Sequence, residues 1–116
     1  MDFEAASEPL DRGIHVVSVR GEVDLATGPE LERALFAVPE DGVESVIVDL
    51  TDCSFMDSTG LHLLTRSQER FERSGGHVAV VAANRGVLRL FELAQLDQLV
   101  PIYPSRAAAL NGNGHH

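Results

Sequence analysis

Hydrophobic positions along this chain change period repeatedly, from runs typical of strands to spacings typical of helices. The strand-like runs are short, rich in β-branched residues and bounded by polar residues. Such runs predict buried strands at residues 14–19, 45–50 and 77–82. We expect residues 2–8 to pair antiparallel with residues 13–20 as an N-terminal hairpin. Residues 99–103 include Pro101, which favours an edge strand over a central one.

Helical periodicity fills the segments between these runs. Thr27, with Glu30 three residues later, has the form of a capping box at the start of the first helix. A second helix is expected to begin near Asp57 or Ser58, and Asn84 is the predicted N-cap of a third. Leu31, Leu35 and Val38 follow at helical spacing in the first helix, and Leu61, Leu64, Gln68 and Phe71 mark one face of the second. The third helix carries Val87, Leu88, Leu90, Phe91 and Ala94.

Alternation of strands and helices predicts an α/β domain. We expect a mixed, largely parallel sheet of four to five strands with helices packed against it. The 116 residues suit one domain, which we place at residues 1–110, with a short last helix at 105–110. Residues 111–116 are expected to form a disordered tail. His115 and His116 are either native or the remnant of a tag, and we assign them no metal role.

The composition and charge restrict the kinds of molecule that this chain is expected to bind and its expected location. The formal net charge of −9 opposes direct binding to nucleic acid or to an anionic membrane. No apolar run is long enough to cross a bilayer, and the N-terminus lacks the features of a signal peptide, so a cytoplasmic protein is expected. Cys53 is the only cysteine, which excludes an internal disulfide and is consistent with a small residue near a strand end.

All nine basic residues are arginines. The absence of lysine excludes a P-loop and Schiff-base chemistry, and it opposes a two-component receiver domain. No nucleophile elbow is present, and no residues have metal-ligand spacing. His15 and His77 lie in strand patterns and are interpreted as ordinary sheet residues. We therefore expect no enzymatic activity, no cofactor and no metal.

The segment from Phe55 to Leu61 is the strongest candidate for function. It joins a buried strand to a helix, and loops at the carboxyl ends of such strands are exposed and often functional. Asp57 or Ser58 can cap the helix, and Gly60 permits a close approach of another backbone or relieves crowding in the first turn. This pattern alone is equally consistent with a well-capped helix start.

The same segment carries a resemblance to a known family. The run from Val46 to Leu61, and above all Met56–Leu61, resembles the signature of bacterial anti-sigma factor antagonists, members of the STAS domain family. The resemblance covers nearly the whole chain, and three further segments occupy similar places: Gly21–Asp24, Gly75–Gly76 and Leu88–Phe91. His62 departs from the pattern, since many antagonists have a small residue there. We expect His62 to face solvent.

This resemblance implies a mechanism. The unphosphorylated protein would bind an anti-sigma factor that is also an ATP-dependent serine kinase, and so free the sigma factor for transcription. The kinase would then phosphorylate Ser58, with Thr59 as the alternative, and a metal-dependent phosphatase would reverse the modification. Asp24, Asp57, Ser58, Thr59 and Gly60 would form the partner surface. Asp57 would either cap the helix or orient Ser58 and help to position the kinase's magnesium.

Phosphate at Ser58 would lie at a helix N-terminus, where free N–H groups and the helix dipole favour an anion. We therefore expect a change in binding with little change in fold. The alternative function is a STAS-domain scaffold or a ligand-sensing component of a stress-signalling complex. Cytoplasmic parts of anion transporters also contain such domains, but the absence of an apolar run disfavours that assignment.

Overall fold

The computed structural model describes residues 2–11 and 13–113. One five-stranded sheet runs through it in the order β1-β2-β3-β4-β5. β1 pairs antiparallel with β2, and the remaining neighbours are parallel, which confirms the mixed, largely parallel sheet and the N-terminal hairpin. The strands are β1 (Glu4–Asp11), β2 (Ile14–Val23), β3 (Ser45–Met56), β4 (His77–Val81) and β5 (Ile102–Tyr103).

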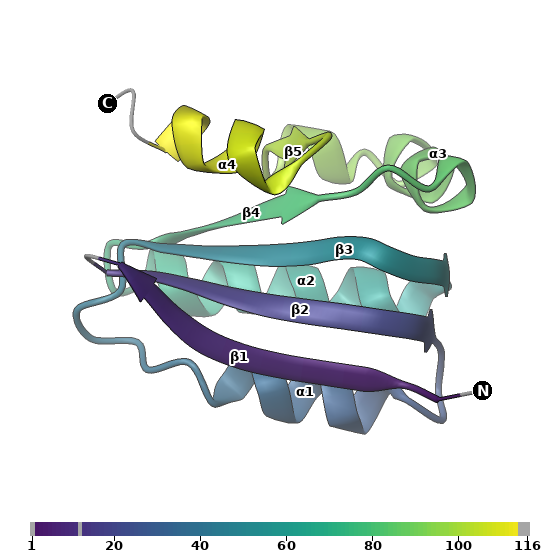
Figure 1. Ribbon diagram of the computed structural model, residues 1–116, viewed down its shortest axis with the longest axis horizontal. Helices are drawn as coiled ribbons and strands as arrows, with labels where there is room; N and C mark the ends of the chain where they lie inside the picture. Colours follow the sequence, from purple (N-terminus) through teal and green to yellow (C-terminus); the bar gives the residue numbers. More distant parts are fainter. Residues whose placement is uncertain (1, 12, 114–116) are drawn as a thin grey trace.

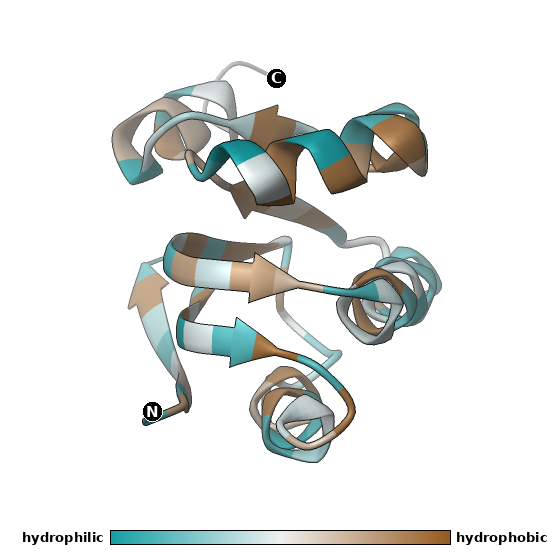
Figure 2. Ribbon diagram, turned by 90° about the vertical axis from the view of Figure 1, so that its right-hand side faces the viewer, coloured by the Kyte–Doolittle hydropathy of each residue, from teal (hydrophilic) through white to brown (hydrophobic). Residues whose placement is uncertain are grey.

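Helices cover both faces of the sheet (Figures 1 and 2). They are α1 (Gly28–Phe36), α2 (Ser58–Glu72), α3 (Arg85–Leu93), the short 3₁₀ helix η1 (Leu96–Gln98) and α4 (Arg106–Asn113). The first three α-helices pack on one face and form the larger apolar core with it. Helix α4 covers part of the other face, where Ala109 packs against Val16, Ile47, Ala79 and Val81.

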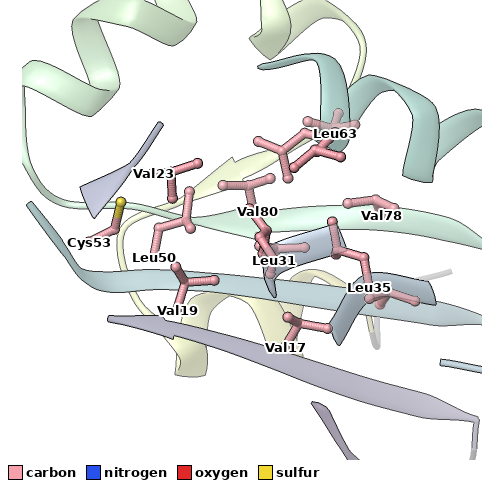
Figure 3. Packing of buried hydrophobic residues seen from close by; sticks show 14 of the residues in the cluster. Val17, Val19, Val23, Leu31, Leu35, Leu50, Cys53, Leu63, Val78 and Val80 are labelled. Atoms are coloured by element: carbon pink, nitrogen blue, oxygen red, sulfur yellow. The ribbon is translucent and has the colours of Figure 1, made fainter. Parts of the chain in front are cut away.

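Strand alternation divides the apolar residues between these two layers. Val17 and Val19 of β2 point into the larger core, whereas Val16 points to the face that α4 covers. Leu31 and Leu35 of α1 pack among the side chains of the larger core, as Figure 3 shows. The sheet and helices thus hold the carboxyl ends of β2 and β3 in a fixed position.

Two strands are longer than the sequence predicted. β2 was expected to end near residue 20 and β3 at residue 50, yet they stay paired as far as Val23 and Met56. Irregular register near Gly21, whose φ is +107°, allows the pairing to continue past a bend. A side chain at Gly21 is also excluded, because its Cβ would lie 2.9 Å from the backbone oxygen of Asp2.

The predicted capping box at Thr27 is wrong in its contacts, although Thr27 is the N-cap residue. Its side chain makes no cap hydrogen bond. The Thr27 hydroxyl instead donates to the backbone oxygen of Glu22 at 2.7 Å, which fastens the turn to the end of β2. Asn84 does cap α3 as predicted, since its Oδ1 accepts a hydrogen bond from Val87 N at 3.1 Å.

The last helix extends past residue 110, where the sequence predicted its end. Helix α4 continues to Asn113, and Gly112 packs so closely on Tyr103 of β5 that a Cβ would overlap its ring. Contact with the sheet explains why residues 111–113 are helical where a disordered tail was expected. The rest of that tail, residues 114–116 with His115 and His116, lies outside the described residues.

Candidate functional site

The start of α2 lies at the carboxyl end of β3, where the chain turns within a single residue. Asp57 is the N-cap, in an extended conformation with φ −112° and ψ −166°. Its Oδ1 accepts a hydrogen bond from Thr59 N at 2.8 Å, which satisfies one of the free N–H groups of the first turn. Asp57 N donates to Val23 O at 3.2 Å and so ties this turn to the end of β2. The capping role predicted for Asp57 is confirmed.

Ser58 is the first residue of α2 and is exposed. Thr59 is only partly exposed, because its Cγ2 lies against the start of α1. A Cβ placed on Gly28 would be 2.8 Å from that methyl group. A partner approaching this end of the sheet therefore meets the Ser58 hydroxyl before that of Thr59.

Gly60 has a helical backbone that any residue can adopt, so glycine is favoured here because a side chain would not fit. A Cβ there would lie 2.5 Å from both Cγ and Sδ of Met56. The sequence pattern left two roles open for Gly60: close approach of another backbone, or relief of crowding in the first turn. The contacting atoms belong to the Met56 side chain, so the lack of a Cβ at Gly60 relieves crowding in the first turn. Met56 is buried under the helix start and supports the segment that presents Ser58.

Asp24 lies in the neighbouring turn, between β2 and α1. Its Oδ1 accepts hydrogen bonds from Ala26 N at 2.9 Å and from Thr27 N at 3.1 Å. Because Val23 is bonded to Asp57, the Asp24 turn lies beside the start of α2. The structure therefore places Asp24 beside Asp57, Ser58 and Thr59, whereas Gly60 is buried and is not part of the exposed surface.

Two hollows, each of about 320 Å³, flank this surface. The first lies between α1 and α2, and its lining includes Leu25, Pro29, Thr59, His62 and Leu63. The second lies between the end of β3 and α3, and its lining includes Phe55, Met56, Val87, Leu90 and Leu93. Ser58 thus lies between the two hollows. Met56, two residues before it, lines the hollow beside α3, and Thr59, the next residue, lines the hollow between α1 and α2.

Sequence reasoning missed Leu25 and Leu93, two exposed apolar residues of these hollows. Leu25 is 83% exposed, Leu93 is 70% exposed and Phe55 is 48% exposed, which is unusual for large apolar side chains. Leu25 and Leu93 fall outside the predicted core faces, and that mismatch was the available signal. His62 is exposed, as expected, and it lines the hollow between α1 and α2.

Three further features bear on function: possible metal-binding groups, the single cysteine and possible membrane spans. Among residues 2–11 and 13–113, no group of three or more acidic, histidine or cysteine side chains is arranged to hold a metal ion. Cys53 is buried, and burial raises the pKa of its thiol even though a hydrogen bond to Phe55 O acts in the opposite direction. Within the described chain, no helix is both long and apolar enough to span a bilayer.

Comparison with known proteins agrees with this geometry. The model of the STAS domain matches residues 8–109. The anti-sigma-B factor antagonist of Staphylococcus aureus (strain NCTC 8325 / PS 47) is 34% identical over 86 residues, which cover 74% of this chain and 80% of the relative. A crystal structure of an anti-sigma factor antagonist from Mycobacterium paratuberculosis has 35% identity and a TM-score of 0.87, covering 96% of this chain and 93% of the other.

More distant structures share the fold. The anti-sigma factor antagonist SpoIIAA in its unphosphorylated form matches with a TM-score of 0.73 at 20% identity, covering 97% of this chain and 99% of the other. The phosphorylated form of SpoIIAA, from Bacillus, matches with a TM-score of 0.71 at 19% identity, covering 93% and 97%. With a family model that spans most of its length and relatives at this level of identity, the chain belongs to the STAS domain family.

Proposed function

We propose that this chain is an anti-sigma factor antagonist that is switched off by phosphorylation of Ser58. The unphosphorylated form binds an anti-sigma factor with serine kinase activity, and the sigma factor is released. The observation that carries this proposal is the exposed Ser58 hydroxyl at the first position of α2, between two apolar hollows, in a chain similar to named antagonists.

Ser58 is suited to be a substrate hydroxyl. Among the described residues its hydroxyl has no hydrogen-bond partner that would activate it as a nucleophile. Its backbone is held by Asp57 and by the bond between Asp57 N and Val23 O, so a kinase meets a fixed target. This capping role of Asp57 leaves room for a second role in orienting the kinase's magnesium.

Phosphate at Ser58 changes the surface more than the fold. It adds about −1.5 to −2 charges at the N-terminus of α2, where the helix dipole favours an anion even though Thr59 N and Gly60 N already bond to Asp57. The same charges lie next to Asp57 and near Asp24, and a buried interface would have to desolvate them. Binding falls while α2 stays folded. The two forms of SpoIIAA, which both match this fold, support such a switch.

The rest of the cycle follows from the same site. A metal-dependent serine phosphatase removes the phosphate and restores the binding form, because the hydroxyl is exposed to a second enzyme as well. Regulation of transcription by a sigma factor places the protein in the cytoplasm. The net charge of −9 agrees with a route through protein partners and without direct contact to nucleic acid.

A binding experiment tests this proposal. Each anti-sigma factor with serine kinase activity in the source genome is purified and titrated with the wild-type chain, with Ser58→Ala and with Ser58→Asp. We expect one of them to bind wild type and Ser58→Ala, and to bind Ser58→Asp at least about 10-fold more weakly, equivalent to about 1.4 kcal/mol. Circular dichroism of Ser58→Asp controls for loss of α2.

Three results would contradict the proposal. Binding to none of these kinases would remove the antagonist function. Equal binding by Ser58→Ala and Ser58→Asp would favour a scaffold. Phosphate mapped by mass spectrometry to Thr59 alone, after incubation with the kinase and ATP, would reassign the modified residue.

A further inference from the structure

Helix α3 is apolar on two sides. Val87 and Phe91 are each 1% exposed and pack into the larger core. Leu93 lies on a neighbouring side of the helix and is 70% exposed, and Leu90, three residues before it, is half-buried against the edge of the core. A helix on the surface of a domain usually presents polar residues to solvent, so this second apolar side needs another explanation. Apolar and polar bands alternate along α3 in Figure 2.

Leu90 and Leu93 line the hollow between α3 and the end of β3, which we call the α3 groove. Its full lining is Ser54, Phe55, Met56, Asn84, Gly86, Val87, Arg89, Leu90 and Leu93. Phe55, on the opposite wall from α3, is 48% exposed. The groove therefore has exposed apolar side chains on both of its walls, which is the composition of a protein-binding groove more than of a solvated surface.

The α3 groove is continuous with the Ser58 surface. Met56 forms part of its lining and also fills the space against Gly60 in the first turn of α2. Ser58 follows Met56 by two residues. A partner whose active site surrounds the Ser58 hydroxyl therefore reaches the groove without crossing another element.

Arg89 supplies charge at the rim of the groove. Four arginines, Arg20, Arg66, Arg70 and Arg106, form ion pairs with carboxylates. Arg89 is exposed and, like Arg33, Arg73 and Arg85, has no ion pair among the described residues, and it is the one of these four that lines the groove. An unpaired guanidinium beside an apolar groove is complementary to a segment that combines an apolar side chain with a carboxylate.

We propose that the anti-sigma factor places an apolar side chain in the α3 groove and a carboxylate opposite Arg89, as a docking contact separate from the hydroxyl that it phosphorylates. This inference rests on the proposed function and adds the source of part of the affinity. Aromatic or aliphatic anchors in such grooves dominate the energy of many interfaces. Contacts in the α3 groove supply affinity, and the phosphorylation state of Ser58 determines whether the complex persists.

The test uses the kinase that binds the wild-type chain, with two groove variants and one matched control. We expect Leu93→Ser and Arg89→Glu to weaken binding about 10-fold or more. Leu10→Ser is the control, because Leu10 is 43% exposed but lies on β1, and it should bind like wild type. Circular dichroism melting curves of all variants exclude unfolding as the cause.

Kinetics give a second readout that a merely structural role would not move. A docking contact is made equally in the ground state and the transition state, so Leu93→Ser should raise KM for Ser58 phosphorylation with kcat unchanged. Lower kcat with unchanged KM would overturn the docking role.

The outcomes separate the two proposals. Failure of the wild-type chain to bind any such kinase would overturn both. Wild-type binding that is matched by Leu93→Ser and Arg89→Glu would overturn the α3 groove alone. A wild-type dimer in sedimentation experiments that dissociates on Leu93→Ser would assign the groove to a second copy of this chain instead.

Discussion

Replacement of Gly60 by alanine should have opposite effects in two backgrounds. In the wild-type chain a Cβ at this position would lie 2.5 Å from Cγ and Sδ of Met56 and 2.8 Å from its Cε. Overpacking of this kind costs about 1–3 kcal/mol. Alanine also favours a helix over glycine by about 0.5–1 kcal/mol, so the net destabilisation should be about 1–2 kcal/mol.

Removal of the Met56 side chain should reverse the sign. Met56→Ala removes the three atoms that a Cβ at Gly60 would meet, so only the helix preference remains. In that background Gly60→Ala should stabilise the protein by about 0.5–1 kcal/mol. The coupling between the two substitutions should therefore be roughly 2 kcal/mol. Met56→Ala alone should cost about 2–5 kcal/mol, because Met56 is buried.

Urea denaturation measures all four variants. The chain has no tryptophan, so far-ultraviolet circular dichroism is the suitable signal, and the m-value should stay constant across the cycle. Gly86→Ala in the wild-type background is the control, since its Cβ would meet only Asn84 Oδ1 at 3.3 Å and, unlike Gly60→Ala, it should not destabilise the protein. Equal destabilisation by Gly60→Ala in both backgrounds would refute the Met56 contact as the reason for glycine.

Two other predictions concern arginine side chains that join elements of the fold. Arg70 donates to the carbonyls at the end of α1, so Arg70→Gln should lower the unfolding free energy by about 1–2 kcal/mol, whereas the exposed Arg66→Gln should cost about 0.5 or less in the same urea titration. Burial raises the pKa of Asp49, but hydrogen bonds from Thr51 and the Arg106 guanidinium outweigh it and lower that pKa below 3.8. Since a lowered folded-state pKa stabilises above the unfolded value, Arg106→Gln should cost about 1 kcal/mol at pH 7, and the deficit should shrink as the pH falls below about 4. A deficit that is independent of pH would contradict this assignment.

Much of the candidate site was predictable because its determinants are local. Asp57 and Asn84 precede helical patterns, and both cap their helices through contacts within three residues. The exposed helix start at Ser58 follows from a strand that ends and a helix that begins within a few residues. Thr27 shows the limit of such reasoning, because its hydroxyl bonds to the Glu22 carbonyl at the end of β2 in place of its own helix.

The ends of the elements depended on distant contacts. Pairing with β2 extends β3 to Met56, and packing on Tyr103 keeps α4 helical through Gly112. These contacts join segments that are far apart in the sequence, so no local pattern contains them. The predicted ends at residues 50 and 110 were wrong for that reason.

By itself, the sequence determined the α/β class, the order of the elements and the exposed Ser58, because periodicity and capping depend on neighbouring residues. Only the tertiary structure decided what surrounds Ser58. It joined Asp24 to Asp57 through the bond to Val23, and it assigned Gly60 to the Met56 side chain. It also placed α3 across the end of β3, which left Leu93 exposed beside the site. Which apolar residues face solvent depends on how elements that are distant in the sequence pack together. Local sequence patterns do not contain that information.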